Sequence, residues 1–222
     1  MRAKTYYPLF ADLNGRCCLV VGGGLVAQRK ASTLLRYGAD ITVVSPEATT
    51  RLAAWAKSGR LRLIQRRFRP SDITGAWLVY AATDEPAINR LVYRSALKRR
   101  VFANVVDQTP LCTFIAPAIV SRGPMTVAVS TGGSSPSLAK RVRSDIGRSL
   151  GQDYVPMLRL LRSLRGVAKR RLPSYGDRKR YFNRLVQGRV FALVRAGRAG
   201  AARREALSLL KREASMTGAA SN

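Results

Sequence analysis

Two features of this sequence could do chemistry: a run of three glycines at residues 22–24 and an isolated carboxylate at Asp107. Glycines between an apolar strand and a helix let the backbone approach a pyrophosphate, which the free N–H groups of the helix start then bind. Asp107 is the only acidic residue between Glu85 and Asp145. A carboxylate beside a nicotinamide can accept a proton while hydride leaves to the cofactor. Together the two features suggest dinucleotide-dependent redox chemistry.

The glycines follow the apolar stretch 17–21 and form the pattern G-x-G-x-x-A with Gly22, Gly24 and Ala27. Apolar residues at helical spacing come next, and residues 40–44 form a second apolar strand, which gives a strand–helix–strand unit of roughly 30 residues. A glycine turn without a nucleotide is the alternative, but this context favours a dinucleotide site. The cofactor contacts expected here are Gly22, Gly23, Gly24, Leu25 and Val26.

The second strand ends in Ser45-Pro46-Glu47, where dinucleotide sites often carry an acidic residue for the ribose hydroxyls. We expect Ser45 and Pro46 to contact the cofactor, and Glu47 is a further candidate for the ribose. A basic residue that could hold a 2′-phosphate does not occur until Arg51, which favours NAD over NADP.

Three more strands are predicted by the apolar stretches at residues 61–64, 77–82 and 101–106. Helical patterns lie between them, at about 51–58 and after Pro86, so strands and helices alternate. This alternation predicts an α/β domain with a parallel sheet. The buried face expected for the helix after Pro86 consists of Ile88, Leu91, Val92 and Leu97.

Ligands of such a sheet bind beyond the carboxyl ends of its strands, which meet at one edge. We therefore expect Gly22, Ser45, Thr83 and Asp107 to line one crevice, with Thr83 as a further cofactor contact. Asp107 is then the catalytic candidate. Capping of the turn at residues 107–110 is an equally weighted alternative for Asp107, because Asp is common in such turns.

The alternation stops after the fifth predicted strand. Residues 114–120 and 125–130 predict two strands joined by a turn at 121–124. From Asp153 onward the apolar spacing is helical, and residues 215–222 are expected to be disordered.

A loop rich in hydroxyl groups and glycine, residues 130–135, precedes a predicted helix from Pro136 to about Leu150. Backbone N–H groups and hydroxyls at a helix start can bind carboxylates. The alternative is an ordinary loop whose side chains only cap the helix.

The charge of the chain is unusual for a globular protein. Its 222 residues include 40 Lys and Arg against 12 Asp and Glu, a formal net charge of +28. A field of this sign attracts polyanions, among them nucleic acid, anionic lipid and small substrates with many carboxylates. A solvated, arginine-rich surface without a specific partner accounts for the charge equally well.

The cysteine and histidine content excludes several classes of site. Cys17, Cys18 and Cys112 give neither a disulfide framework nor a zinc motif, and we expect the first two to lie in a buried strand. The sequence contains no histidine, which excludes imidazole acid–base chemistry and His-ligated metals. The longest apolar runs are strand-sized and no signal-peptide core follows the N-terminus, so we expect a cytoplasmic protein without a membrane partner.

Four motifs occur in a fixed order along the chain: residues 20–30 (VVGGGLVAQRK), 81–84 (AATD), 104–107 (NVVD) and 129–136 (VSTGGSSP). In order and spacing they resemble the precorrin-2 dehydrogenase and sirohydrochlorin ferrochelatase family, the N-terminal part of siroheme synthase. The resemblance covers roughly residues 8–210.

The resemblance implies an α/β protein in which a Rossmann-like parallel sheet domain is followed by a small α+β dimerisation segment and an all-helical C-terminal domain. The corresponding boundaries are residues 1–115, 116–150 and 151–222, with the disordered tail at the end. It also implies a homodimer in which the middle segment is exchanged between subunits.

The activity implied by the resemblance is NAD-dependent oxidation of precorrin-2 to sirohydrochlorin, and in bifunctional members also insertion of Fe²⁺ to give siroheme. Asp107 is implicated in dehydrogenation and, where iron is inserted, in chelation. The substrate carries eight carboxylates, which gives the excess of arginine a task. The residues expected around the substrate are Asn104, Thr131, Gly132 and Ser135.

Two departures from the family pattern bear on these expectations. Some chelating members use a histidine, and its absence here leaves iron insertion open. Fused members carry a methyltransferase domain, so we expect a separate uroporphyrinogen methyltransferase to supply the substrate of this chain. The alternative function is an NAD-sensing binding module whose basic helical half binds nucleic acid or a partner, although it leaves Asp107 without a role.

Overall fold

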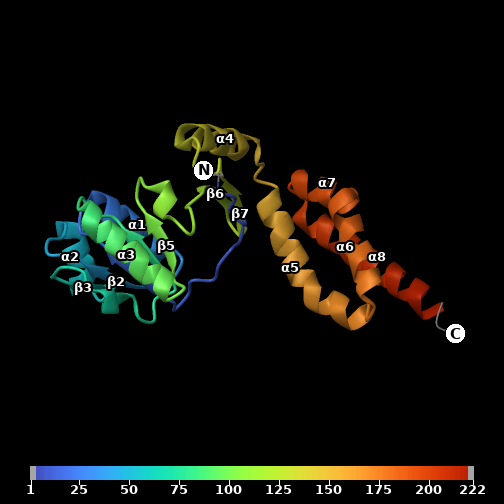
Figure 1. Cartoon of the computed structure of the whole chain (residues 1–222). Coiled ribbons are helices and arrows are strands. Elements are labelled where there is room, and N and C mark those ends of the chain that lie inside the picture. Colours follow the sequence, from blue (N-terminus) through green and yellow to red (C-terminus); the bar gives the residue numbers. More distant parts are fainter. Residues whose placement is uncertain (1–3, 220–222) are drawn as a thin grey trace. The chain divides into compact units, whose positions relative to one another are not determined.

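The computed structural model describes residues 4–219, which fall into two compact units. The sheet unit comprises the chain up to Ala116 together with Gly132–Ser134, and the helical unit comprises Pro117–Thr131 and the chain from Ser135. Both are shown in Figure 1. Each unit has its own buried apolar residues and is described by itself.

The sheet unit is built on five parallel strands: β1 (Cys17–Val21), β2 (Asp40–Val44), β3 (Arg62–Ile64), β4 (Leu78–Ala81) and β5 (Phe102–Val105). Their order is β3-β2-β1-β4-β5, so the chain reverses direction across the sheet after β3. Val21 pairs with both Val44 and Ala81, which brings the carboxyl ends of three strands level at one edge. The predicted parallel α/β sheet is confirmed.

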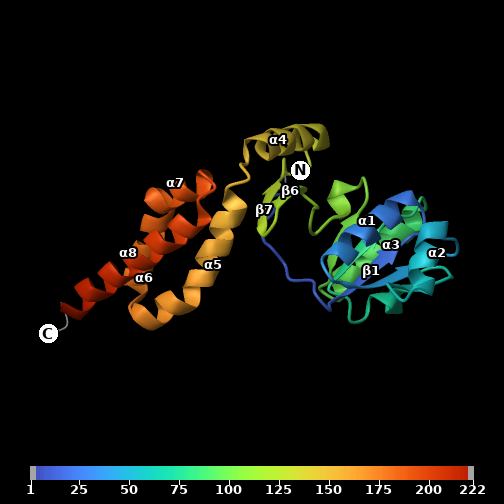
Figure 2. The ribbon, with the colours of Figure 1, turned by 180° about the vertical axis from the view of Figure 1, so that it is seen from behind.

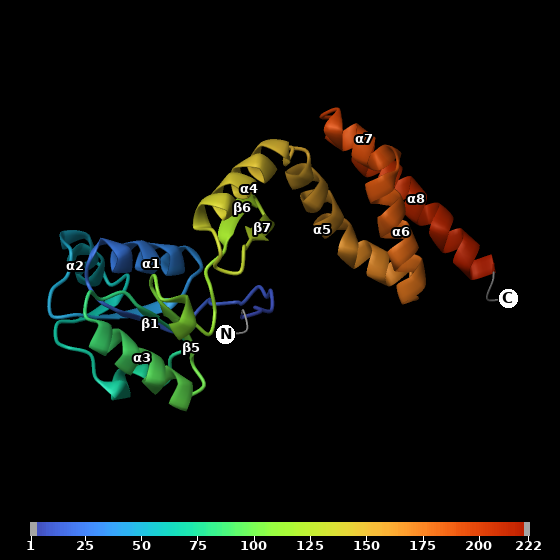
Figure 3. The ribbon, with the colours of Figure 1, turned by 45° about the horizontal axis from the view of Figure 1, so that its top comes forward.

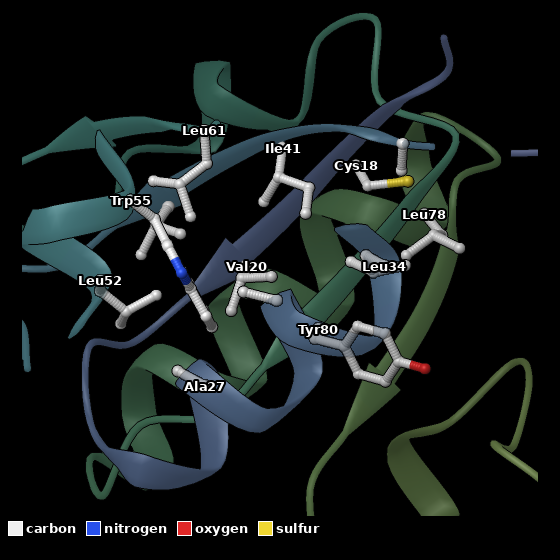
Figure 4. Packing of buried hydrophobic residues seen from close by; sticks show 13 residues of the cluster. Cys18, Val20, Ala27, Leu34, Ile41, Leu52, Trp55, Leu61, Leu78 and Tyr80 are labelled. Atoms are coloured by element: carbon white, nitrogen blue, oxygen red, sulfur yellow. The ribbon is translucent and has the colours of Figure 1, made fainter. Parts of the chain in front are cut away.

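Helices cover both faces of this sheet. Helices α1 (Leu25–Arg36) and α2 (Thr50–Lys57) pack on one face, and α3 (Pro86–Lys98) with the short 3₁₀ helix η1 (Pro70–Ile73) packs on the other. Figure 3 shows α1 and α3 on opposite sides of β1. The first of the two apolar clusters, drawn in Figure 4, is formed by alternate strand residues and by one face each of α1 and α2.

The buried face of α3 differs from the expectation. Leu91 and Leu97 are 37% and 46% exposed, whereas Asn89 and Ser95 are buried together with Val92. Asn89 can be buried because its side-chain amide donates to the carbonyl oxygen of Thr83 at 2.9 Å and accepts from the Thr83 hydroxyl at 2.9 Å. Hydrogen bonding to the preceding loop thus overrides the apolar pattern at this helix.

The helical unit begins with the two-stranded hairpin β6 (Ala118–Arg122) and β7 (Met125–Val129). Arg122 pairs directly with Met125, so the turn contains two residues rather than the four that were predicted. The strand expected from residue 114 is also wrong before Ala118. Phe114 instead packs against Tyr80 of the sheet unit with ring centroids 5.3 Å apart, and its backbone N–H donates to Ala103.

Five helices complete the helical unit: α4 (Pro136–Ser149), α5 (Tyr154–Arg171), α6 (Tyr175–Gln187), α7 (Arg189–Arg195) and α8 (Ala199–Ala219). Figures 1 and 2 show α6, α7 and α8 side by side. They share one apolar cluster with α5, in which the buried hydroxyl of Tyr181 donates to the carbonyl oxygen of Ala206 at 3.0 Å. Because α8 continues to Ala219, the expected disorder is wrong for residues 215–219; the last three residues lie outside those the structure describes.

The three cysteines are all free, and Cys18 and Cys112 are buried. Cys17 is exposed, contrary to the expectation, because it is the first residue of β1 and the strand is buried only from Cys18 onward. Between residues 4 and 219, no helix is both long enough and apolar enough to cross a bilayer.

Candidate functional site

A pocket opens at the carboxyl ends of β1, β2 and β4 in the sheet unit. It is lined by four of the residues predicted to hold the cofactor: Gly22, Ser45, Pro46 and Thr83. The predicted crevice therefore exists, but Asp107 is not among the residues that line this pocket. The lining residues that sequence reasoning missed include Arg67, Phe68, Glu85 and Ile88.

The glycine run is packed so closely that two of its members accept no side chain. A Cβ atom added at Gly22, whose φ is +118°, would lie 2.2 Å from the carbonyl oxygen of Ala82, and one added at Gly23 would lie 1.8 Å from that of Glu47. Gly24 is different, since a Cβ atom there would meet nothing within 4 Å. The first two glycines thus join three strand ends, and Gly24 leaves open space in front of the helix.

Helix α1 starts at that open space without a side-chain cap. Gly24 is its N-cap, and as a glycine it has no side chain that could accept from the first turn. The first intrahelical hydrogen bond runs from Gln28 to Gly24, so the N–H groups of Leu25 and Val26 point out of the helix start. Leu25 is 76% exposed. An open cradle beside uncapped N–H groups fits a dinucleotide pyrophosphate.

Ser45 and Thr83 contribute to this pocket in different ways. Ser45 is 8% exposed, and its backbone N–H donates to the carbonyl oxygen of Ile64 at 3.2 Å. The Thr83 hydroxyl donates to Asn89 and accepts from the backbone N–H of Glu85 at 3.2 Å. Because the hydroxyl of Thr83 is engaged within its own loop, Thr83 shapes the wall of the pocket.

Asp107 lies just beyond β5 on an unusual backbone. Its φ is +57°, in the left-handed region that Asp tolerates better than most residues but that still costs free energy. The turn that follows is closed by backbone bonds, from Gln108 to Val105 and from Leu111 to Gln108. Within residues 4–219 the carboxylate of Asp107 makes no hydrogen bond or ion pair, so the turn-capping alternative is not observed.

The side chain of Asn104 is hydrogen-bonded within the protein. Its side chain is buried, with 8% exposure of the residue, and its amide donates to the carbonyl oxygen of Phe114 at 3.0 Å. The segment after Asp107 is further held by Thr113, whose hydroxyl accepts from the backbone N–H of Ala103 at 2.7 Å, and by Lys4, which donates to the carbonyl oxygens of Pro110 and Cys112. Asn104 thus anchors the segment that surrounds Asp107.

The loop after β7 caps its helix. Ser135 is the N-cap of α4 and accepts from the backbone N–H of Leu138 at 3.2 Å, while the Thr131 hydroxyl accepts from that of Ser135 at 3.1 Å. Gly132 belongs to the same unit as Asp107, whereas Thr131 and Ser135 belong to the helical unit. A Cβ atom at Gly133 would lie 3.1 Å from Thr109, which places Gly133 beside the turn after Asp107.

Lys30 was not singled out from the sequence. It lies on α1, half-buried, with its ammonium 4.7 Å from the centroid of the Tyr80 ring. Burial lowers the pKa of Lys30, with a smaller lowering by Arg29, and the negative field of Asp107 opposes this shift. Burial also raises the pKa of Tyr80 to about 12. The signal that could have revealed Lys30 is its position on the sheet-facing side of a helix whose other cations point outward.

Comparison with known families adds to this geometry. Residues 9–118 match a family model described as "Putative NAD(P)-binding", residues 122–149 one described as "Sirohaem biosynthesis protein central", and residues 153–210 one described as "Sirohaem synthase dimerisation region". The three matches follow one another along nearly the whole chain. The chain belongs to the siroheme synthase family. This confirms the resemblance that four sequence motifs indicated.

Members of the siroheme synthase family are similar to the chain over most of its length. It is 44% identical over 181 residues to siroheme synthase 3 of Aeromonas hydrophila, covering 82% of this chain and 39% of that protein. It is 40% identical over 200 residues to siroheme synthase 1 of Serratia proteamaculans, covering 90% of this chain and 42% of that protein. The chain thus spans about two fifths of the length of these curated relatives.

A solved structure, "SirC, precorrin-2 dehydrogenase", matches with a TM-score of 0.75 and 27% identity. The match covers 93% of this chain and all of that one. It confirms the predicted fold class, a Rossmann-like parallel sheet followed by helical segments.

Proposed function

We propose that this chain is an NAD-dependent precorrin-2 dehydrogenase, which oxidises precorrin-2 to sirohydrochlorin in siroheme biosynthesis. The observation that carries the proposal is Asp107, a carboxylate that makes no hydrogen bond or ion pair among residues 4–219, held on left-handed backbone at the end of β5. It lies in a domain whose sequence matches an NAD(P)-binding model and whose fold resembles a precorrin-2 dehydrogenase.

The residues proposed to hold NAD are those at the carboxyl ends of β1, β2 and β4. Gly24, Leu25 and Val26 would bind the pyrophosphate through uncapped N–H groups, while Gly22 and Gly23 keep the strand ends together. Ser45, Pro46 and Thr83 would line the pocket for the rest of the dinucleotide. When bound, NAD accepts the hydride that leaves the substrate.

Asp107 is proposed to accept the proton that the substrate loses as hydride departs. A two-electron dehydrogenation removes one hydride and one proton, so the site needs one base in addition to NAD. The carboxylate of Asp107 is suited to this role because no other side chain among residues 4–219 holds it by a hydrogen bond. Asn104 and Lys4 fix the surrounding segment, which keeps the base in one position.

The remaining expectations become part of the same proposal. The match to a dimerisation region at residues 153–210 supports a homodimer, with the division at residues 1–115, 116–150 and 151–222. Asn104, Thr131, Gly132 and Ser135 are proposed around the substrate on the strength of the motifs that contain them. We place the enzyme in the cytoplasm, downstream of a separate uroporphyrinogen methyltransferase.

Insertion of Fe²⁺ is a separate question, raised by the similarity to siroheme synthases. In the part of the chain that the structure describes, no three Cys, Asp or Glu side chains are grouped to hold a metal ion. Insertion would therefore depend on Asp107 and on the nitrogens of the tetrapyrrole itself. The same assay can measure both steps.

The test is an anaerobic assay of the purified protein with enzymatically generated precorrin-2 and NAD, followed by NADH absorbance and the spectrum of sirohydrochlorin. We expect both products to form together above the rate without enzyme. Addition of Fe²⁺ then reports siroheme formation. Absence of NADH with an intact fold would overturn the dehydrogenase and favour a binding module, which a nucleic-acid titration at several salt concentrations would examine.

A further inference from the structure

Lys30 has hydrogen-bond donors for which residues 4–219 supply no acceptor. An ammonium carries three donors, and a half-buried one ordinarily finds a carbonyl or carboxylate. Here its contact within the protein is the face of Tyr80, 4.7 Å from the ring centroid. Neither a hydrogen bond nor an ion pair joins it to another residue of the described chain. The protein therefore holds this charge in place without neutralising it.

The surroundings of Lys30 also distinguish it from a surface lysine. Its neighbour Arg29 is exposed and adds a repulsive positive charge. Tyr80, beneath the ammonium, packs against Phe114 with ring centroids 5.3 Å apart, and the carbonyl oxygen of Phe114 accepts from the Asn104 side chain at 3.0 Å. Lys30 therefore lies on the face of the sheet against which the segment after Asp107 packs, and the negative charge of Asp107 opposes the lowering of its pKa. An anionic group entering this region would gain a charge-assisted hydrogen bond in surroundings that screen it poorly.

The position of Lys30 along α1 bears on which anion it meets. Lys30 is six positions after Gly24, a distance of about 9 Å along the helix axis. The uncapped N–H groups that suit a pyrophosphate lie beside Gly24, at the start of the helix, and not beside Lys30. Lys30 lies instead over Tyr80, on the face of the sheet where Phe114 and the segment after Asp107 pack, and a substrate of the base would lie on that side.

We propose that Lys30 binds a carboxylate of the substrate and thereby positions the substrate over Asp107. The inference rests on the proposed function, since it takes the substrate to be a polycarboxylate that Asp107 deprotonates. Tyr80 serves as a rigid support for the ammonium, because a cation over an aromatic face keeps its donors free to bind an anion. Lys30 is a substrate-binding residue in this scheme and takes no part in proton transfer.

The experiment compares Lys30→Met and Lys30→Gln, which remove the charge, with Lys30→Arg, which keeps it. Arg29→Met is the matched control, since it removes the same charge from the adjacent, exposed position of the helix. For both neutral variants we expect the KM for precorrin-2 to rise about tenfold, as loss of one hydrogen bond to a charged group predicts, while kcat changes much less. Lys30→Arg should recover most of the loss, and Arg29→Met should stay within about twofold of wild type.

Two binding measurements accompany the kinetics. The Kd for sirohydrochlorin, measured by titration, should rise in parallel with the KM, and the Kd for NAD should not change. An unchanged KM in both neutral variants, or a fall in kcat alone, would overturn the inference. A wild-type protein that forms no NADH would instead overturn the proposed function, so the two failures are distinguishable.

Discussion

A Cβ atom on Gly23 would lie 1.8 Å from the backbone carbonyl oxygen of Glu47, much closer than any side chain can approach a backbone atom. The backbone N–H of Thr49 donates to the carbonyl oxygen of Gly23 at 2.9 Å, and the Thr49 hydroxyl donates to the side chain of Gln28 at 2.7 Å. The glycine run and the loop after β2 are therefore one packed structure. Gly23 is therefore needed for the packing of these two loops, whereas Gly24, whose Cβ position is open, is not.

We predict that Gly23→Ala destabilises the sheet unit and abolishes NAD binding, because the two loops must move apart to admit a methyl group. Gly24→Ala is the matched control. Its backbone has φ −77° and its Cβ position meets nothing within 4 Å, so this variant should keep the wild-type melting temperature. It should nevertheless bind NAD more weakly, since the methyl group enters the space proposed for the pyrophosphate.

Calorimetric melting and NAD titration check both variants. A Gly23→Ala protein that melts like wild type would contradict the packing argument.

Replacement of Asp107 by Asn should remove activity and leave the fold intact. Asn accepts the left-handed backbone of this position, where φ is +57°, and has nearly the same volume, but it cannot take up a proton. We expect kcat to fall at least about a hundredfold, with little change in melting temperature. Asp12→Asn, at an exposed carboxylate that accepts from the backbone N–H of Asn14, should behave like wild type. Near-normal turnover by the Asp107 variant would exclude this residue as the base.

Arg67 lines the pocket proposed for NAD together with Ser45 and Pro46, so it offers a positive charge beside the end of β2. We predict that Arg67→Ala weakens NAD binding by roughly threefold to tenfold and weakens NADP binding more, because the 2′-phosphate adds charge at this end of the dinucleotide. Titrations with both dinucleotides test this. Arg62→Ala, an exposed position on β3, provides the comparison. Equal affinities of the Arg67 variant and wild type for both dinucleotides would remove Arg67 from the site.

Asp72 makes the stability of the sheet unit depend on pH. Its carboxylate receives two hydrogen bonds from Arg66, at 2.6 and 2.8 Å, and one from the backbone N–H of Arg69. The side-chain hydrogen bond from Arg66 lowers the pKa of Asp72 below its ordinary value of 3.8, and the Arg69 backbone contributes in the same direction. A lowered folded-state pKa stabilises the protein above the ordinary value, and this stabilisation is lost as the pH falls through the lowered one.

Asp72→Asn should therefore melt several degrees below wild type at pH 7, and the difference should shrink as the pH falls below 3.8. Thermal unfolding across this pH range measures the effect. Asp145→Asn, at a carboxylate whose ion pairs on α4 are exposed, should show little difference from wild type at any pH. A constant difference between Asp72→Asn and wild type at all pH values would show that the effect is steric.

The sequence predicted the sheet well because each buried strand lies between clear turn signals. The strand at residues 40–44 has the predicted bounds, and Ala27 is fully buried where the fingerprint requires a small residue. The two-residue turn between β6 and β7 was missed because Ser121 and Arg122 look like turn residues but pair with Thr126 and Met125. Leu91 and Leu97 were wrongly assigned to the buried face of α3. Apolar periodicity identifies one face of a helix, but it does not show how much of that face the neighbouring elements cover.

The residues that line the pocket were predictable where they follow a strand directly, as Ser45 and Thr83 do. Arg67 and Lys30 could not be found in this way. Arg67 comes to the pocket after the short edge strand β3, and Lys30 becomes special only through Tyr80, a residue of another element fifty positions away in the sequence. The engagement of Asn104 by Phe114 likewise depends on a tertiary contact. Pairings of this kind carry no local pattern.

The hydrogen bonds from Lys4 to Pro110 and Cys112 have a practical consequence for anyone who purifies this protein. An affinity tag ahead of residue 1 would be attached close in the sequence to Lys4, whose hydrogen bonds hold the turn after Asp107. Kinetic constants measured with the tag at either end would show how far the hydrogen bonds of Lys4 hold this turn in place. Expression with the tag at the other end, or its removal before assay, keeps these hydrogen bonds undisturbed.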